Sequence, residues 1–400
     1  MRIGLSTSVI QRGHSGVGQY VLALVRALQT TAARHEFFLF VLEEDLPLFE
    51  FARATMQIVP VDERFRPPAK NIFWHQQALP GLARNLQLDV LHVPSYRRLL
   101  WRRPCALVAT IHDLAPFRVP KKYDWLRMLY GRVAVRQLAR RQDEIVAVSH
   151  TTARDIERYF RLPSHRVTVV HNGLDHSRFT PEGRHEASQF VAARHGLRPP
   201  FFLYIARLEH PAKNHVRLIS AFNRFKTESP SPWQLVLGGR DWDGAATIHE
   251  HVRQSPFAAD IHSLGFVPQA ELPAWYRAAT VFVYPTLFEG FGLPPLEAMA
   301  CGCPVLASTD SAVDEVCGDA AARANPESVD DLTRQLTRLA KDEGLRQDLR
   351  IRGLARARQF DWSMTAAATL AIYTRAATNL NRARAPAPLE AAAIEHPQTD

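Results

Sequence analysis

The sequence predicts an α/β protein that contains two doubly wound parallel sheets, each covered by helices. Short apolar segments alternate with amphipathic segments of helical period, which is the pattern of parallel strands joined by helices. This alternation runs twice along the chain, on either side of a Pro-containing stretch at 180–200. The length of 400 residues also exceeds what one hydrophobic core usually covers, which favours two domains.

The first cycle is expected to form an N-terminal domain over residues 1–180. The loop 14–18 follows the first strand and leads into a helix whose apolar face includes Tyr20. Thr152, with Asp155 three residues later, resembles a capping box that would open the helix after the last strand of the cycle. The strands are expected at 2–5, 37–42, 90–93, 107–111 and 144–148.

The second cycle is expected to form a C-terminal domain over residues 181–360. Two parallel sheets that face each other would leave a central cleft, and ligands of such sheets bind beyond the carboxyl ends of the strands. The stretch 382–400 is rich in Ala and Pro and is expected to be a disordered tail. The strands of this cycle are expected at 201–205, 234–237, 261–264, 281–284 and 304–307.

The composition is that of a soluble globular protein, with 46% apolar and 22% charged residues. No apolar run reaches the ~18 residues that a transmembrane helix needs, and Arg2 is followed by a polar run rather than the apolar core of a signal peptide. The four cysteines lack the spacing of a disulfide framework or a metal knuckle, so we expect small buried residues in a reducing compartment. These features predict a cytoplasmic protein.

The segment from Glu289 to Glu297 carries the strongest functional signal. It follows the fourth strand of the second cycle and runs into a helix predicted at 296–300. Gly290 and Gly292 would let the backbone approach a ligand, and the free N–H groups at a helix start favour a negative charge. Each feature alone could be structural, because glycines are common in turns and a glutamate in the first turn of a helix interacts favourably with the helix dipole. The complete run instead favours an anion-binding site.

This segment resembles the Glu-x7-Glu signature of the retaining glycosyltransferases of family 4, which have the GT-B fold of two Rossmann-like domains. The flanking residues 283–286 and 298–305 are similar to that family as well. The resemblance is dense over 202–308 and extends more loosely back to Ile3. It implies sugar transfer from a nucleotide-sugar donor with retention of anomeric configuration, and a final helix, about 361–378, that returns to the first domain.

The resemblance also assigns roles to residues. In the family, the glutamate matching Glu289 contacts hydroxyl groups of the donor sugar, and the glutamate matching Glu297 binds the ribose of the nucleotide. The amides of the Gly-Phe-Gly segment and the helix start face the diphosphate. The expected donor contacts are Gly16, Gly18, Arg207, Lys213, Val267, Glu289, Gly290, Phe291, Gly292, Leu293 and Glu297.

Arg207 ends a predicted strand and Lys213 opens the helix after it, so both should lie at the carboxyl edge of the second sheet. A fixed Arg and Lys could stabilise a departing pyrophosphate without a metal ion. A lone Arg or Lys is usually a solvated surface cation, but this pair resembles the Arg and Lys pair of the family. Residues 209–212 between them depart from the family pattern, in which Gly or Lys is more frequent near the second cation.

Two weaker signals lie in the N-terminal half. Gly16 and Gly18 match the glycine loop of the family, although they lack the third glycine of a dinucleotide fingerprint. His112 ends a strand beside Asp113 and could be part of a core pair. The resemblance instead implies that His112 lies near the reactive carbon of the donor sugar, without establishing that it acts as a base. The expected catalytic residues are His112, Glu289, Arg207 and Lys213.

Neither a metal nor another cofactor is expected. No Asp-x-Asp motif ends a predicted strand, and the Asp241-Trp242-Asp243 segment lies in a loop that we interpret as structural.

The net charge of +9 suits nucleic acid, an anionic membrane surface or a phosphorylated small molecule. The stretches 96–103 and 121–130 combine cations with aromatic and aliphatic residues, which suits an anionic leaflet but also the solvated face of an ordinary helix. We expect contact with the inner face of the plasma membrane, because a lipid-linked acceptor would enter at this half. Further cations follow at Arg132, Arg136, Arg140 and Arg141.

The sequence therefore favours a hexosyltransferase similar to the bacterial mannosyl- and hexosyltransferases of surface polysaccharide assembly. Mannose from a GDP- or UDP-linked donor and a lipid-linked or polysaccharide acceptor are expected. A sugar-nucleotide epimerase or a phosphorylase of the same fold is the alternative, although no lysine site for pyridoxal phosphate is recognisable. A glycosidase is disfavoured because Glu297, inside an anion-binding helix, would be a poor proton donor. A nucleic-acid-binding protein is disfavoured because the cations are scattered and no binding module accompanies them.

Overall fold

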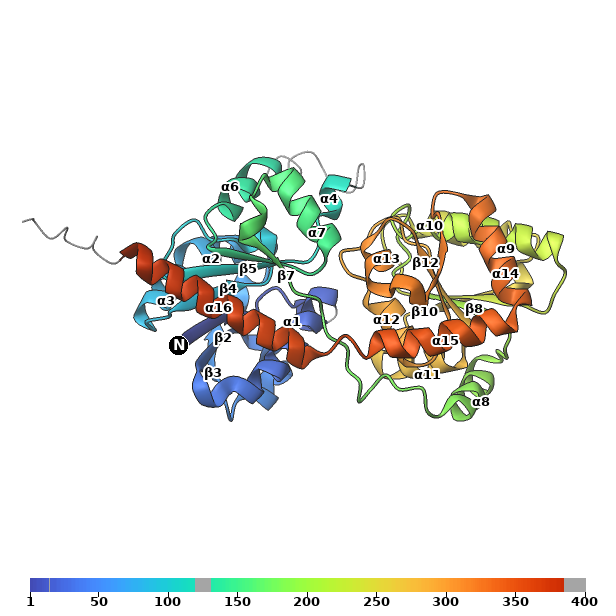
Figure 1. Cartoon of the computed structure of the whole chain (residues 1–400), viewed down its shortest axis with the longest axis horizontal. Helices are drawn as coiled ribbons and strands as arrows, with labels where there is room; N and C mark the ends of the chain where they lie inside the picture. The colour runs from blue at the N-terminus through green and yellow to red at the C-terminus, as the bar shows by residue number, and fades with distance from the viewer. Residues whose placement is uncertain (14, 119–130, 385–400) are drawn as a thin grey trace, which may run out of the picture.

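The computed structural model of the chain describes residues 1–13, 15–118 and 131–384, which form two α/β domains (Figure 1). Each domain contains a parallel sheet covered by helices, which confirms the predicted fold class. Central strands such as the one at Ala106–Ile111 are buried along their whole length, because helices on both faces exclude water from both sides of a parallel sheet.

The N-terminal sheet consists, within the described residues, of the seven strands β1 (Arg2–Ser6), β2 (Glu36–Leu42), β3 (Gln57–Val61), β4 (Val90–Val93), β5 (Ala106–Ile111), β6 (Glu144–Ala147) and β7 (Val167–Val169). They lie in the order β3-β2-β1-β4-β5-β6-β7, so the winding reverses between β1 and β4. Helices of this domain include α1 (Gly16–Leu28), α2 (Pro68–Gln77), α3 (Leu79–Asn85), α4 (Ala115–Arg118), α6 (Arg136–Ala139) and α7 (His150–Asp155).

The C-terminal sheet consists, in the described part of the chain, of β8 (Phe201–Ile205), β9 (Gln234–Gly238), β10 (Ile261–Gly265), β11 (Val281–Tyr284), β12 (Val305–Ser308) and β13 (Ala322–Ala324). Their order, β10-β9-β8-β11-β12-β13, reverses between β8 and β11. The helices include α8 (Arg184–His195), α9 (His215–Glu228), α10 (Ala245–Arg253), α11 (Leu272–Ala278), α12 (Leu293–Ala300), α13 (Ala312–Cys317), α14 (Val329–Lys341) and α15 (Glu343–Ala357).

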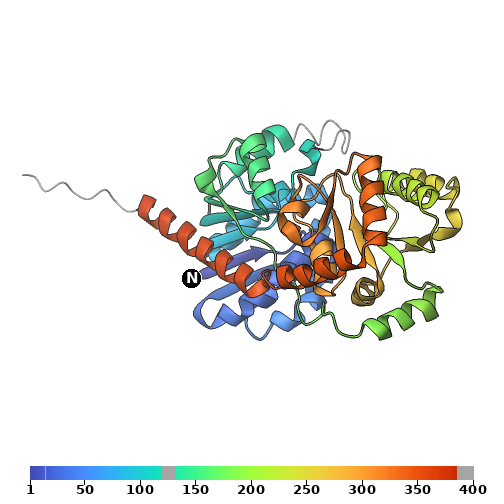
Figure 2. The same ribbon diagram turned by 45° about the vertical axis from the view of Figure 1, so that its right-hand side comes forward.

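The last helix, α16 (Trp362–Arg384), leaves the C-terminal domain and lies along the N-terminal one (Figures 1 and 2). Tyr373 places its hydroxyl 2.7 Å from His92 Nδ1, and Arg375 forms two hydrogen bonds, of 2.7 and 2.8 Å, with the Glu144 carboxylate. The helix runs past the predicted start of the tail at 382, and residues 385–400 of that tail lie outside the described residues. Among the described residues, no helix is both long and apolar enough to cross a bilayer.

Three predicted helix starts were wrong by a few residues. Helix α7 is capped by Ser149, whose Oγ accepts a 3.0 Å hydrogen bond from Thr152 N, so Thr152 is not the cap. Helix α12 begins at Leu293 rather than 296, because Gly292 adopts the left-handed conformation that starts it. Helix α1 begins at Gly16, so the expected glycine loop is the first turn of the helix, capped by Ser15.

Candidate functional site

The carboxyl ends of β8 and β11 bring Lys213 and Glu289 into contact. Lys213 Nζ forms an ion pair with Glu289 Oε1, and the hydroxyl of Tyr284 donates to the same oxygen at 2.7 Å. The two charged side chains are only 13% and 19% exposed, so water screens the pair weakly. Residues that lie far apart in the sequence therefore form one polar group at the edge of the C-terminal sheet.

Arg207 lies in the same loop as Lys213 but has different partners. Its guanidinium donates to Glu209 Oε2 at 3.0 Å and lies 4.9 Å from the centre of the Trp242 ring. The loop that carries Trp242 is held by backbone hydrogen bonds to Leu208 and His210, which agrees with its interpretation as structural. Arg207 is 49% exposed, so it is open to a ligand, whereas Lys213 is mostly enclosed.

Gly290 lies at the contact between the two domains. A Cβ atom at this position would be 1.8 Å from the carbonyl oxygen of His112, at the end of β5. The Gly290 carbonyl accepts hydrogen bonds from Ser149 Oγ at 2.7 Å and Thr152 Oγ1 at 3.1 Å. Room for a ligand, which the sequence suggested, is therefore not the whole reason for this glycine. The close approach of the N-terminal domain already requires a residue without a side chain at this position.

His112 lies beside this contact, with its ring edge against Tyr20 of α1 at 4.6 Å between ring centres. Burial lowers the pKa of His112 to about 4, against the opposing effects of Asp113 and of a hydrogen bond with the Pro94 backbone. The imidazole is thus uncharged at neutral pH. Within the described residues, its buried Nε2 has no hydrogen-bond partner, so this atom can serve a ligand.

Glu297 lies one turn inside α12, where the Tyr276 hydroxyl donates to its Oε2 at 2.9 Å. Burial raises the pKa of Glu297, while the hydrogen bond from Tyr276 and the nearby Arg178 act in the opposite direction. Arg178 belongs to the segment between the domains, so this segment passes close to the second glutamate.

Between its two glutamates, the Glu-x7-Glu segment contains a buried aromatic side chain and the start of α12. Phe291 is 5% exposed and packs against His171 and Phe360, with ring centres 5.8 and 5.9 Å apart. Leu293 is the first residue of α12, and Gly292 before it has a φ of 106°. In the described part of the chain no side chain caps the start of this helix, so those of its first amides that do not belong to the two prolines stay available to an anion.

Three other expected donor contacts lie outside the segment formed by β11 and α12. Val267 is buried after β10 and packs against Gly238 at the end of β9. Gly16 faces open space, whereas a Cβ at Gly18 would be 2.5 Å from the Ile10 carbonyl oxygen. Gly18 is therefore required for packing of α1, and only Gly16 leaves room for a ligand.

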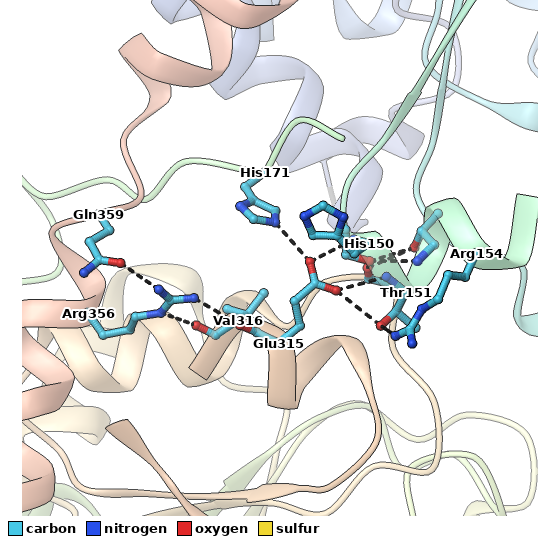
Figure 3. Close-up of polar contacts among 11 residues, drawn as sticks. His150, Thr151, Arg154, His171, Glu315, Val316, Arg356 and Gln359 are labelled. Atoms are coloured by element: carbon cyan, nitrogen blue, oxygen red, sulfur yellow. Dashed lines mark hydrogen bonds and ion pairs between the residues drawn. The ribbon is translucent and has the colours of Figure 1, made fainter. Parts of the chain in front are cut away.

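A second contact between the domains is formed by Glu315 of α13, which points at the start of α7 (Figure 3). Its Oε1 accepts from the His150 backbone N–H at 2.8 Å and lies 3.0 Å from His171 Nε2. Its Oε2 accepts from the Thr151 N–H at 3.0 Å and from the Thr151 hydroxyl at 3.2 Å. A carboxylate at a helix start is favoured by the helix dipole, so Glu315 stabilises this arrangement of the two domains.

Among the described residues, the side chains of His150, His171 and Glu315 place ligand atoms within 4.8 Å of one another. Both oxygens of Glu315 already accept hydrogen bonds from α7, as described above. We therefore interpret this group as a contact between domains rather than as a metal site.

Replacing Glu315 with Gln should lower stability in a pH-dependent manner. Burial alone would raise the pKa of Glu315, but hydrogen bonds from His171 and from the backbone of His150 and Thr151 prevail and lower it to about 2. Because the folded pKa lies below the unfolded value, the stabilisation is present above pH ~4.5 and is lost as the pH falls towards ~2; it amounts to about 3 kcal/mol. Unfolding curves of the two proteins should differ at pH 7, and the difference should shrink as the pH falls from ~4.5 towards ~2.

The control is Glu250→Gln, which removes an exposed carboxylate beside Arg253 on α10 and should change little. A constant difference between wild type and Glu315→Gln down to pH ~3 would show that the charge of Glu315 does not act at this contact.

The structure adds residues that the sequence did not indicate: Ser149, Tyr276, Tyr284 and Glu315. Ser149 could have been found as a helix cap, because it directly precedes α7. The tyrosines could not, because each lies in an apolar segment that predicts only a buried side chain.

The basic stretch 96–103 is only partly exposed. Leu99 and Leu100 are fully buried, so they cannot enter a leaflet as expected. Trp101 is 51% exposed, and the guanidinium of Arg141 stacks 3.8 Å from the centre of its ring. Arg103 pairs with Asp143. The second basic stretch, 121–130, lies outside the described residues.

Comparison with protein families finds two matches that together cover both domains. Residues 14–178 match the model described as Glycosyltransferase Family 4, and residues 187–356 match the model described as Glycosyl transferases group 1.

Similar proteins include the O-antigen chain mannosyltransferase B of Escherichia coli, 30% identical over 393 residues, which cover 93% of this chain and 99% of that protein. The serotype-specific mannosyltransferase WbdA of Escherichia coli is 28% identical over 68% of this chain, a match that spans only 34% of WbdA. Among solved structures, Anabaena Alr3699/HepE in complex with UDP and glucose has a TM-score of 0.73 at 17% identity, over 94% of this chain and 100% of that one.

Proposed function

Because the chain belongs to glycosyltransferase family 4, we propose that this glycosyltransferase is a retaining, metal-independent mannosyltransferase acting on a lipid-linked or polysaccharide acceptor. The observation that carries this proposal is the group formed by Lys213, Tyr284 and Glu289, in which Glu289 directly precedes the glycine that lies against the His112 backbone at the domain contact. Mannose is favoured because similar proteins are named mannosyltransferases, one of them of the O-antigen chain. The N-terminal domain would bind the acceptor and the C-terminal domain the nucleotide sugar.

Within the C-terminal domain, Glu297 would bind the ribose and Glu289 the hydroxyl groups of the sugar. The non-proline amides at the start of α12 and the exposed Arg207 would face the diphosphate. Lys213 would stabilise the charge that develops as the diphosphate departs, which supports transfer without a metal ion. The uncharged Nε2 of His112 would accept a hydrogen bond from the donor sugar or the acceptor.

Thermal unfolding with GDP, UDP, ADP and dTDP tests the proposal, followed by transfer assays with the matching nucleotide sugar. GDP should give the largest stabilisation and GDP-mannose should be consumed, with transfer persisting in EDTA. Glu297→Ala should weaken nucleotide binding roughly ten-fold or more, because a hydrogen bond to a charged acceptor contributes ~1.5–3 kcal/mol. Strict dependence on Mg²⁺ or Mn²⁺ would overturn the metal-independent assignment, and unchanged nucleotide affinity of a folded Glu297→Ala protein would remove Glu297 from the donor site.

We further propose that the protein acts at the cytoplasmic face of the plasma membrane and meets the leaflet near Trp101. Replacing Arg102 and Arg103 with Gln and Trp101 with Ala should reduce binding to vesicles that contain anionic lipid. Each surface cation that is removed takes away ~1 kcal/mol of attraction to the anionic leaflet. Binding by the wild type should weaken in salt, which screens these charges. Transfer to a soluble acceptor analogue should be unaffected.

The control replaces Arg334 and Arg338, both exposed on α14 of the other domain, with Gln. Vesicle binding that falls equally in both variants would indicate a nonspecific effect of net charge.

A further inference from the structure

Each of the two glutamates of the Glu-x7-Glu segment is held by one buried tyrosine. Tyr276 donates to Glu297 at 2.9 Å and Tyr284 donates to Glu289 at 2.7 Å. The tyrosines are 1% and 3% exposed, although they come from different elements, α11 and the end of β11. A hydrogen bond from a tyrosine hydroxyl to a glutamate carboxylate therefore occurs twice, at the two glutamates that are proposed to bind the donor.

The two tyrosine rings are fixed by one row of aromatic contacts. Phe282, two residues before Tyr284 on β11, stacks on Tyr284 with 5.7 Å between ring centres. Its other neighbour is the edge-on ring of Tyr276, at 5.2 Å. Tyr204 packs against Tyr284 from β8, at 5.7 Å. Because close-packed rings cannot shift independently, both hydroxyl groups are held at fixed positions relative to the sheet.

Both hydroxyl groups act as donors rather than as bases. Burial and the adjacent carboxylates raise the pKa of Tyr276 and of Tyr284 well above the usual value, so both stay protonated at any working pH. A protonated hydroxyl donates a charge-assisted hydrogen bond to a carboxylate, which restricts the rotamers of a flexible glutamate before the ligand arrives.

We propose that Tyr276 and Tyr284 are positioning residues that orient Glu297 for the nucleotide and Glu289 for the donor sugar. The proposal rests on the proposed function, because it takes the roles of the glutamates from it. Each tyrosine should therefore affect the same step as the glutamate that it contacts. Tyr276 should act on affinity for the free nucleotide, and Tyr284 should act on turnover.

The test uses Tyr276→Phe and Tyr284→Phe, which remove one oxygen each and keep the ring in its row. For the nucleotide that the wild type binds best among GDP, UDP, ADP and dTDP, Tyr276→Phe should raise Kd about ten-fold with little change in kcat. Tyr284→Phe should lower kcat about ten-fold with little change in that Kd. Tyr373→Phe is the control, because it removes an equally buried hydroxyl from the His92 contact in the other domain.

Double variants distinguish positioning from a general structural role. Once Glu297 is replaced by Ala, adding Tyr276→Phe should cost no further nucleotide affinity, and Tyr284→Phe should cost no further turnover in Glu289→Ala. Wild-type behaviour of both single tyrosine variants, or equal losses with and without the glutamate, would overturn the proposal. If Glu297→Ala and Glu289→Ala themselves behave as wild type, the proposed function fails instead.

Discussion

Gly290→Ala should reduce sugar transfer at least a hundred-fold while leaving each domain folded. The added Cβ would lie 1.8 Å from the His112 carbonyl oxygen, which is backbone and cannot rotate away. The domains would have to separate, and the hydrogen bonds from Ser149 and Thr152 to the Gly290 carbonyl would break. A misplacement of about 1 Å at a reacting centre costs on the order of a hundred-fold in rate. Binding of the free nucleotide should fall much less, because its proposed contacts lie within the C-terminal domain.

Transfer rates, nucleotide affinity and the unfolding temperature should be compared with those of Gly81→Ala. Gly81 lies in α3, and a Cβ there would meet nothing within 4 Å, so this variant should behave as the wild type. Normal transfer by a folded Gly290→Ala protein would show that catalysis does not require the domain contact seen in this structure.

Lys213→Ala should lower turnover about a hundred- to a thousand-fold, comparable to the loss of a main electrostatic stabiliser in other enzymes. The substitution removes the cation beside the departing diphosphate and leaves Glu289 without its ion-pair partner. Glu289→Ala should also lower turnover strongly. Because the two side chains are in contact, the double variant should lose less than the product of the two single losses. Arg207→Ala should have a smaller effect, since its exposed guanidinium pairs separately with Glu209.

The control is Lys226→Ala, which removes another buried lysine from an ion pair, 2.9 Å from the more exposed Asp260, away from the strand ends that carry the site. This variant should lose stability but retain turnover. If the turnover of the double variant falls by the full product of the two single losses, the ion pair does not persist in the working enzyme.

Most strands that the sequence predicted are buried, whereas the strands that it missed lie at sheet edges; the partly exposed edge strand β10 is the exception, because it was predicted. The central strands, such as β5 and β11, are buried along their length and stand out as apolar runs. The missed strands are β3, β7 and β13, which lie at edges of the sheets. Strand β3 contains Pro60 and has partly exposed residues, and β7 and β13 have only three residues each. An edge strand needs no continuous apolar run, because one side of it is not covered by another strand.

The sequence by itself determined the α/β class, the two cycles of strands and helices, and the Glu-x7-Glu segment, since periodicity and motif spacing are local properties of the chain. Tertiary structure alone decided which groups meet. Lys213 pairs with Glu289 across 76 residues, Gly290 lies against the end of β5, and Glu315 reaches the start of α7. Such contacts depend on the order of the strands in each sheet and on how the two domains approach each other. Neither is encoded in local patterns of the sequence.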